Sequence, residues 1–214
     1  MTNRQWKVAV LGATGLVGDT MIKILEERNF PVAELFPLAS SRSLGKTVEF
    51  KGKRLDVIDV DTFDFSKADI GLFSAGGDVS RAYAPKAGAA GCVVIDNSSA
   101  FRMDPNTPLV VPEVNAGDLA RHNGVVANPN CTAAILSVAV WPIHQAAGVK
   151  RIIVSTYQSA SGAGAAAMQE LEDQVREYSA GKPVTKKVFP NQIAFNVFSH
   201  NTKVAENGYN EEEN

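Results

Sequence analysis

The sequence has few of the features that mark secreted, membrane-spanning or nucleic-acid-binding proteins. Its 214 residues include only two cysteines, so there is no disulfide framework, and such cysteine usage is typical of a reducing compartment. No uncharged apolar run is long enough to span a bilayer, and residues 1–7 lead into an apolar segment without the core of a signal peptide. The formal charge of -2, without basic clusters, argues against nucleic acid as the main partner. We therefore expect a cytoplasmic protein that binds neither membrane nor nucleic acid.

Histidine is scarce too, and none of the three histidines, His122, His144 and His200, lies in a recognisable motif. Each is expected to be a surface or packing residue. The cysteines and histidines show no paired ligand spacing, so no metal site is predicted. A reactive thiol usually works with an acid/base partner. Either that partner lies outside these 214 residues, or the candidate thiol, Cys131, is not catalytic.

A glycine-rich turn follows the first apolar segment of the chain. Residues 7–11 (KVAVL) predict a short strand, and residues 12–18 (GATGLVG) follow at once. Apolar residues then recur at helical spacing, from Val17 to Leu25. Strand, glycine turn and amphipathic helix are the context of a dinucleotide site, because glycines let the backbone approach a pyrophosphate at the helix N-terminus. The G-x-x-G-x-x-G spacing is common in NADP-binding variants, and the alternative is a tight structural turn.

The second predicted strand, residues 34–39, ends in Ser40-Ser41-Arg42-Ser43. An enzyme that uses NAD places an acidic residue here to hold the ribose 2′-hydroxyl, and an acid would repel a 2′-phosphate. Arg42 and the neighbouring hydroxyls are instead suited to bind that phosphate, which favours NADP. The alternative is that Arg42 is a solvated loop residue.

The remaining elements up to about residue 130 alternate between strands and helices. Residues 69–75 and 92–95 predict buried strands, residues 46–60 a small hairpin, and residues 80–90 a helix that is broken or offset at Pro85. This alternation predicts an α/β fold with a Rossmann-like doubly wound sheet.

Polar residues follow the strand at 92–95, in the segment 96–102 (DNSSAFR). A strand end that carries Asn, two Ser and an Arg is suited to bind an anion at the carboxyl edge of the sheet. Arg102 is the candidate ligand. Taken alone, an arginine paired with a surface carboxylate is the simpler interpretation.

Cys131 is the candidate nucleophile. It lies in residues 128–133 (NPNCTA), after a proline-containing turn and before a helix-compatible run. A thiol in the first turn of a helix faces unpaired N–H groups and the positive end of the macrodipole, and both stabilise the thiolate. Asn128 and Asn130 are candidates for capping or oxyanion-type hydrogen bonds. The alternative, a buried structural cysteine, suits Cys92 better, because Cys92 lies within a strand-like segment.

A second region with a different organisation follows Cys131. Its helix should extend to about Ala147, with an interruption or kink at Pro142. Residues 150–158 (KRIIVSTYQ) predict a strong strand, residues 159–164 a small-residue turn that allows close approach of a ligand, and residues 165–178 a helix. Residues 193–198 predict another short extended piece.

Taken together, these motifs resemble the aspartate-β-semialdehyde dehydrogenase family. The shared landmarks, which keep the family's order along essentially the whole chain, are GATGLVG (12–18), SSRS (40–43), FSAGG (73–77), DNSSAFR (96–102), VVPEVN (110–115), NPNCTA (128–133), STYQSASGAG (155–164) and IAFN (193–196).

The resemblance implies NADPH-dependent reductive dephosphorylation of L-aspartyl-4-phosphate to aspartate semialdehyde, in the route to lysine, threonine and methionine. In this interpretation Cys131 attacks the acyl phosphate and forms a thioester, Arg102 holds the phosphate, Gln158 positions the substrate and Glu212 binds its amino group. The residues expected to contact NADP are Gly12, Thr14, Gly15, Leu16, Val17, Arg42, Ser43, Ser161 and Gly162. A homodimer or homotetramer is implied as well.

The resemblance also implies a division into an NADP-binding Rossmann-like domain, 1–130, and an incomplete α+β catalytic and dimerisation domain, 131–214. Family members continue well beyond residue 214, and their acid/base histidine, a substrate-binding arginine and a phosphate-binding lysine lie in that portion. We therefore expect this chain, truncated relative to the family, to show little or no turnover by itself.

Three other interpretations compete with this one. N-acetyl-γ-glutamyl-phosphate reductase uses the same thioester chemistry but has a different cysteine motif. The extended NADP-binding sugar epimerases share the GATGLVG turn and use a Tyr-x-x-x-Lys pair. Residues 83–86 (YAPK) miss that spacing, whereas residues 178–182 (YSAGK) have it, so this alternative stays open. The third is a non-catalytic fragment that binds NADP.

Overall fold

The computed structural model describes residues 4–199 and 203–210. The predicted substrate ligand Glu212 and the histidine His200 lie outside the described residues. The chain forms two compact units, Met1–Thr156 and Tyr157–Asn214, and each is described by itself.

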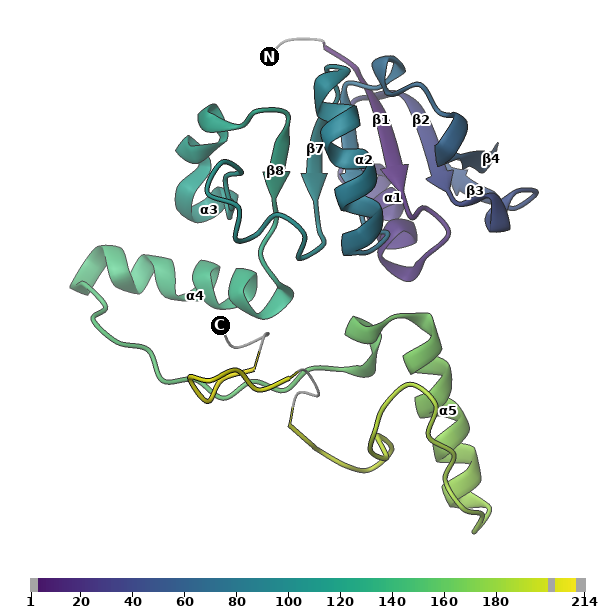
Figure 1. Ribbon diagram of the computed structural model, residues 1–214, viewed down its shortest axis with the longest axis vertical. Helices are drawn as coiled ribbons and strands as arrows, with labels where there is room; N and C mark the ends of the chain where they lie inside the picture. Colours follow the sequence, from purple (N-terminus) through teal and green to yellow (C-terminus); the bar gives the residue numbers. More distant parts are fainter. Residues whose placement is uncertain (1–3, 200–202, 211–214) are drawn as a thin grey trace. The chain divides into compact units, whose positions relative to one another are not determined.

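The first unit is built on a six-stranded sheet in the order β5-β2-β1-β6-β7-β8, in which every neighbouring pair is parallel (Figure 1). Its strands are β1 (Trp6–Leu11), β2 (Val32–Ala39), β5 (Ile58–Asp59), β6 (Ile70–Phe73), β7 (Val93–Asp96) and β8 (Val125–Ala127). The helices of this unit are α1 (Leu16–Glu27), α2 (Gly77–Ala89), α3 (Pro112–Asn115) and α4 (Cys131–Ala147), with short 3-10 turns η1 (Ser41–Ser43), η2 (Val60–Thr62), η3 (Phe65–Lys67) and η4 (Ala116–Arg121). The predicted hairpin is formed by β3 (Thr47–Phe50) and β4 (Lys53–Asp56), which pair antiparallel.

Successive residues of β1 face opposite sides of the sheet, as the pleat of a strand requires. Ala9 and Leu11 belong to one buried cluster, and Val8 and Val10 belong to the other. Helix α2 contributes to the first cluster and α1 to the second, so helices cover both faces. The predicted α/β fold with a doubly wound sheet is therefore confirmed.

The interruptions predicted at two prolines were wrong, whereas a kink of α4 at Pro142 stays a prediction. Helix α4 runs without interruption from Cys131 to Ala147 and contains Pro142, and α2 starts at Gly77 and contains Pro85. Proline removes one backbone donor, but its φ is compatible with a helix. When the hydrogen bonds of the neighbouring turns are intact, the helix continues through the proline despite the loss of one hydrogen bond.

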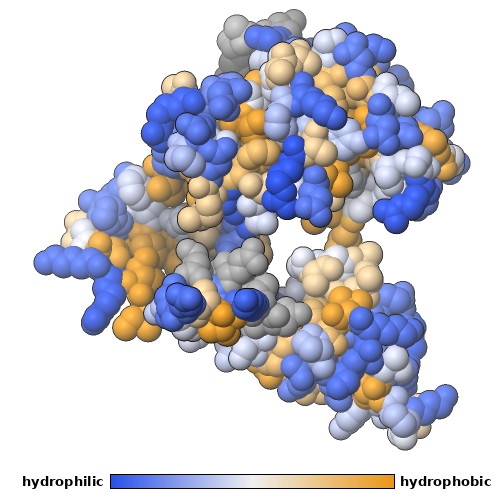
Figure 2. All heavy atoms as spheres, in the orientation of Figure 1, coloured by the Kyte–Doolittle hydropathy of each residue, from blue (hydrophilic) through white to orange (hydrophobic). Residues whose placement is uncertain are grey.

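Helix α4 is apolar in sequence, yet none of its residues is buried. Ile135 is 71% exposed and Ile143 58%. Figure 2 shows hydrophobic side chains on the surface at α4. Even so, no helix within the described ranges is long and apolar enough to cross a bilayer.

The strong strand predicted at residues 150–158 is absent, and this prediction was wrong. The segment has no regular secondary structure, and Ile153 is 87% exposed and Tyr157 84%. A strand exists only beside a second strand that completes its hydrogen bonds, and no strand pairs with this segment in the described part of the chain. The extended piece predicted at 193–198 is likewise not a strand, and Phe195 has a φ of 56° there.

The second unit is organised around helix α5 (Ala165–Ser179), which follows the 3-10 turn η5 (Ala160–Ala163). Glu170, only 6% exposed, accepts hydrogen bonds from the backbone N–H groups of Lys187 at 2.8 Å and Phe189 at 3.2 Å, and from Val188 between them. One buried carboxylate therefore holds three consecutive backbone donors of the returning chain.

Gln174, one helical turn further along α5, is fully buried and continues this arrangement. Its amide nitrogen donates to Glu170 at 3.1 Å and to the carbonyl oxygen of Thr185 at 3.0 Å. Its oxygen accepts from the backbone N–H groups of Ile193 at 2.9 Å and Ala194 at 3.1 Å. Polar side chains of α5 thus fix the loop 185–194, which has no secondary structure of its own.

The carboxylate of Glu170 should make this loop sensitive to acid. Burial raises the pKa of Glu170, but the backbone N–H donors of Val188, Lys187 and Phe189 outweigh burial and hold the pKa below its ordinary value. A lowered pKa in the folded state means that the stabilisation is present above the unfolded pKa of about 4.3 and is lost as the pH falls through the folded pKa.

We expect Glu170→Gln to destabilise the 185–194 loop by about 2 kcal/mol at neutral pH, because it removes a charged acceptor and places an amide donor against backbone donors. Hydrogen exchange of the amides at 187–189, followed by mass spectrometry, measures the effect. The control is Glu172→Gln on the same helix, which removes only an exposed ion pair with Arg176. Equal exchange in the two variants would contradict the prediction.

Candidate functional site

The glycine turn between β1 and α1 is shaped by close backbone packing. Gly12 has a φ of +89°, and its N–H donates to the carbonyl oxygen of Leu38 at 2.9 Å. A Cβ built on Gly18 would lie 2.2 Å from the Gly12 carbonyl oxygen, a distance that no side chain tolerates. The third glycine is therefore required for α1 to approach the turn.

The first turn of α1 is open to an anion. Its N-cap residue is Gly15, which supplies no capping side chain. Leu16 and Val17 are 36% and 42% exposed. Helix N-termini whose N–H groups have no side-chain cap bind phosphate through those donors and the macrodipole. These residues fit the pyrophosphate of a dinucleotide.

The segment after β2 lies against this turn. The hydroxyls of Thr14 and Ser43 are 3.3 Å apart, although 29 residues separate them in the chain. Arg42 is exposed in η1, directly before Ser43. The structure thus brings the predicted cofactor residues of the first turn and of the SSRS segment to one place.

This place is the switch point of the sheet. The chain passes from β1 to β2 on one side and later returns to β6 on the other side of β1. Ser74, just after β6, donates its hydroxyl to the carbonyl oxygen of Leu11 at 3.2 Å, and Gly76 begins a second glycine turn with a φ of +93°. In open α/β sheets, ligands bind outside the carboxyl ends of the strands at such a point.

The predicted anion ligand Arg102 is half-buried and is held by backbone carbonyl groups. Its Nε donates to the carbonyl oxygen of Asn128 at 2.9 Å, and its Nη2 donates to that of Asn97 at 3.2 Å. Among the described residues, no carboxylate forms an ion pair with Arg102. A guanidinium has five N–H donors. The donors that the carbonyls leave over, and the uncompensated charge, suit an anion.

Asn97 and Asn128 also pair through their side chains. The Nδ2 of Asn128 donates to the Oδ1 of Asn97 at 2.6 Å, which joins the ends of β7 and β8. Asn128 was predicted to cap a helix or to bind an oxyanion and Asn97 to belong to the anion-binding strand end, but their pairing was not predicted. A polar residue directly after each of two neighbouring parallel strands was the signal available for this pair.

Cys131 is the first residue of α4 and is exposed. The side chain of Asn130 caps the helix by accepting from the N–H of Ala133 at 2.6 Å, which confirms the predicted capping role. The sulfur lies 3.8 Å from the hydroxyl oxygen of Thr132. An exposed thiol in the first turn of a 17-residue helix is accessible to an electrophile from solvent.

Cys92 has the opposite surroundings. It is fully buried in the core cluster on the α2 side of the sheet, as predicted. Burial, with a smaller contribution from the charge of Asp69, raises the pKa of the Cys92 thiol to about 11. At neutral pH this thiol stays protonated and is inert, so Cys131 is the cysteine available for chemistry.

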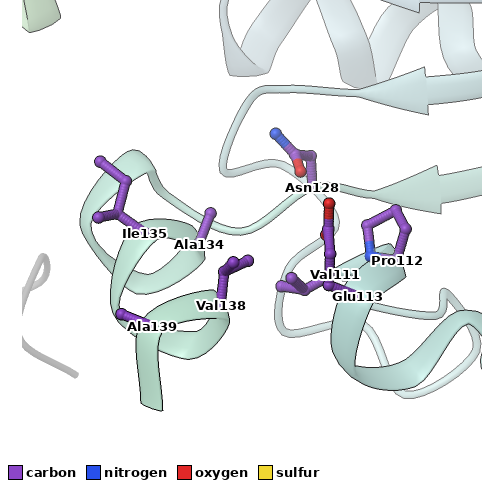
Figure 3. A pocket seen from close by; sticks show the side chains of 8 residues that line it. All are labelled: Val111, Pro112, Glu113, Asn128, Ala134, Ile135, Val138 and Ala139. Atoms are coloured by element: carbon purple, nitrogen blue, oxygen red, sulfur yellow. The ribbon is translucent and has the colours of Figure 1, made fainter. Parts of the chain in front are cut away.

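A hollow of about 500 Å³ lies next to the first turns of α4 (Figure 3). Apolar residues of α4 line it on one side, and the start of α3 lines it on the other. Its polar lining groups are Asn128 and Glu113, and the remaining residues are Val111, Pro112, Ala134, Ile135, Val138 and Ala139.

Three predicted site residues lie in the second unit and are described within it. Gln158 and Ser161 flank a turn in which the hydroxyls of Ser159 and Ser161 are 2.5 Å apart, and Gly162 follows in η5. The N-cap of α5, Gly164, supplies no capping side chain and has a φ of +91°.

Neither described histidine lies beside Cys131. His144 is on α4, thirteen residues further along, which corresponds to roughly 20 Å of helix; its Nδ1 accepts from the N–H of Val149 and its ring stacks on Trp141. His122 precedes β8, so it belongs to the amino end of that strand, and its Nδ1 accepts from the N–H of Gly124. The described residues also contain no group of three or more His, Cys, Asp or Glu side chains that could hold a metal ion.

Comparison with known families gives two matches. Residues 7–122 match the family model of the semialdehyde dehydrogenase NAD binding domain, and residues 140–214 match that of the semialdehyde dehydrogenase dimerisation domain. Neither match tests the predicted division after residue 130, which stays a prediction.

Two relatives of known name are similar to this chain over nearly its whole length. The chain is 56% identical over 213 residues to an aspartate-semialdehyde dehydrogenase of Shewanella violacea and 53% identical to one of Legionella pneumophila. Each alignment includes 99% of this chain. It spans 63% and 61% of the lengths of these relatives.

Solved structures agree with these matches. Aspartate semialdehyde dehydrogenase II of Vibrio cholerae, in a complex with ASA, aligns with a TM-score of 0.96 at 50% identity over 98% of this chain and 63% of that one. The Candida albicans enzyme with NADP aligns with a TM-score of 0.55 at 25% identity, over 67% of this chain and 48% of that one.

Proposed function

The chain belongs to the semialdehyde dehydrogenase family, and from this premise we propose that it serves the NADPH-dependent reductive dephosphorylation of L-aspartyl-4-phosphate to L-aspartate-4-semialdehyde. The observation that carries the proposal is the placement of Cys131. Its exposed thiol begins α4 three residues after Asn128, whose carbonyl oxygen accepts a hydrogen bond from Arg102. Both the candidate nucleophile and the candidate anion ligand thus follow the carboxyl ends of neighbouring parallel strands, β8 and β7, which supports the proposal.

The proposed reaction has two covalent steps. The sulfur of Cys131 attacks the acyl carbon; a C–S bond forms and the C–O bond to phosphate breaks, so that phosphate leaves toward the remaining N–H donors of Arg102. Helix N–H groups at the start of α4 stabilise the oxyanion of the intermediate. A nicotinamide cofactor held at the glycine turn would supply the hydride that reduces the thioester carbon. Cys131 would then leave as the thiolate when the C–S bond breaks and the aldehyde forms.

A nicotinamide dinucleotide fits the glycine turn, where α1 has no side-chain cap and Gly18 packs on Gly12. That the cofactor is NADP is our proposal. It is supported by Arg42 and Ser43, which follow β2 where an NAD enzyme needs an acidic residue. Gly12, Thr14, Gly15, Leu16 and Val17 would hold the phosphates, and we assign Ser161 and Gly162 to the same cofactor.

Replacing Arg42 with alanine is expected to weaken NADPH binding about 10- to 100-fold and to change NADH binding less than about twofold, because only NADPH carries the 2′-phosphate that a guanidinium binds. Fluorescence titration of the 214-residue chain with each cofactor measures the two affinities. The control is Arg28→Ala, which removes an exposed charge at the other end of α1. Equal losses for both cofactors would contradict the NADP assignment.

The acid/base partner of Cys131 is not among the described histidines, since His122 and His144 lie away from it. We therefore propose that this chain accepts the acyl group but turns over slowly. Gln158 would position the substrate, and Glu212 would bind the substrate amino group.

The test is to mix the 214-residue chain with L-aspartyl-4-phosphate and to follow two quantities, the intact mass and semialdehyde formation. We expect one aspartyl group per chain, mapped by peptide mass spectrometry to Cys131 and not to Cys92, with little semialdehyde after NADPH is added. N-acetyl-γ-glutamyl phosphate is the second arm. If N-acetyl-γ-glutamyl phosphate acylated the chain and L-aspartyl-4-phosphate did not, the proposed substrate would be wrong. Rapid formation of semialdehyde would refute the proposal of slow turnover.

We further propose that the protein acts in the cytoplasm, as a homodimer or homotetramer. The match of residues 140–214 to a dimerisation domain supports the oligomer.

A further inference from the structure

The carboxylate of Asp96, at the end of β7, is fully buried and has no part in the proposed chemistry. Its Oδ1 accepts from the hydroxyl of Ser80 on α2 at 2.6 Å and from the N–H of Ser98 at 3.1 Å, and its Oδ2 accepts from the hydroxyl of Ser98 at 2.7 Å. No lysine or arginine of the described chain forms an ion pair with it. A buried polar group must find hydrogen-bond partners, and here all the partners are neutral donors.

The hydrogen bonds of Asp96 continue into the turn that leads to Arg102. The hydroxyl of Ser98, itself only 9% exposed, accepts from the N–H of Ala100 at 3.1 Å. The carboxylate therefore holds the Ser98 backbone directly, and it holds the Ala100 backbone through the hydroxyl of Ser98. Asn97, which lies between Asp96 and Ser98, presents the carbonyl oxygen that accepts from Nη2 of Arg102.

We propose that Asp96, acting through Ser98, is a positioning residue for the guanidinium of Arg102. The inference rests on the proposed function, in which Arg102 binds the phosphate of the substrate. Asp96 fixes the turn from inside the core, the turn fixes the Asn97 carbonyl group, and that carbonyl group with the one of Asn128 fixes the guanidinium. A guanidinium held in this way meets a phosphate without first ordering its side chain, which lowers the entropic cost of binding.

Ser80 provides a matched control. Both Ser80 and Ser98 are buried and each donates a hydroxyl to the same carboxylate, but Ser80 belongs to α2 and only Ser98 is part of the turn. Ser98→Ala and Ser80→Ala should therefore lower the melting temperature by similar amounts. Only Ser98→Ala should weaken the hydrogen bonds that fix the guanidinium of Arg102.

The readout is the exchange rate with water of the Arg102 Nε–H proton, measured by NMR in the full 214-residue chain and assigned with Arg102→Lys. Ser98→Ala removes the hydrogen bond between the Ser98 hydroxyl and Asp96, and we expect the Arg102 Nε–H proton to exchange about tenfold faster. In Ser80→Ala the exchange rate should rise less than about twofold. In Ser98→Thr, which restores the hydroxyl, the rate should return to that of the unaltered chain. Equal acceleration in both alanine variants, or none in Ser98→Ala, would overturn the inference, because the network would then serve stability alone.

The affinity for inorganic phosphate, measured by phosphorus NMR on the same samples, separates this inference from the function on which it rests. We expect Ser98→Ala to weaken phosphate binding about tenfold more than Ser80→Ala does. If the unaltered chain bound no phosphate at Arg102, the proposed phosphate role would fail. The effect of Ser98→Ala on the Arg102 proton would still decide whether Asp96 positions that side chain.

Discussion

Replacing Cys131 with alanine is expected to abolish acyl transfer from aspartyl phosphate to the chain, a loss on the order of 10⁴-fold or more, because no other group can form the covalent intermediate. The exposed thiol at the start of α4 is the only cysteine sulfur of this chain that can reach a substrate, since Cys92 is fully buried with a pKa of about 11. Single-turnover release of phosphate measures the rate.

Cys92→Ala is the matched control for this experiment. It removes the other thiol from the core cluster and leaves a small cavity, so we expect a loss of about 1 kcal/mol in stability and acyl transfer within about twofold of the unaltered chain. Cys131→Ser keeps the shape of the side chain but offers a weaker nucleophile and should be nearly as inactive as alanine. Acyl transfer that survives in Cys131→Ala would eliminate the thioester route.

Gly18→Ala should have the second largest effect, on cofactor binding. The new Cβ would lie 2.2 Å from the Gly12 carbonyl oxygen and 2.9 Å from the Ala13 Cα. Both are backbone atoms, so no change of side-chain rotamer relieves the clash. Alanine is favoured over glycine within a helix by about 1 kcal/mol. Overpacking costs about 1–3 kcal/mol and here distorts the turn itself, so the steric loss should exceed the gain.

We expect NADPH affinity to fall at least about tenfold in Gly18→Ala, because α1 and the turn can no longer approach each other as the pyrophosphate requires. Fluorescence titration gives the affinity, and thermal denaturation gives the stability. Gly117→Ala, in η4, is the control: a Cβ added there would meet no atom of the described chain within 4 Å, so stability should stay within about 0.5 kcal/mol. Unchanged NADPH affinity in Gly18→Ala would exclude the glycine turn as the cofactor site.

The anion site was only partly predictable from the sequence. Arg102 and Cys131 stood out because their residue types and local context carry chemistry. The pairing of Asn97 with Asn128, 31 residues away, and the contact of Asp96 with Ser80 on α2 depend on which strands and helices become neighbours. A local pattern does not contain that information.

The sequence by itself determined the elements whose signal is local: the alternation of strands and helices, the glycine turn at 12–18, and the N-terminal cap of α4 at Asn130. These follow from hydrophobic periodicity, from the space that glycine leaves and from the reach of a short polar side chain. Tertiary structure decided the rest. Helix α4 continues through Pro142 because its neighbouring turns tolerate one lost hydrogen bond, and residues 150–158 form no strand because a strand is defined by a partner.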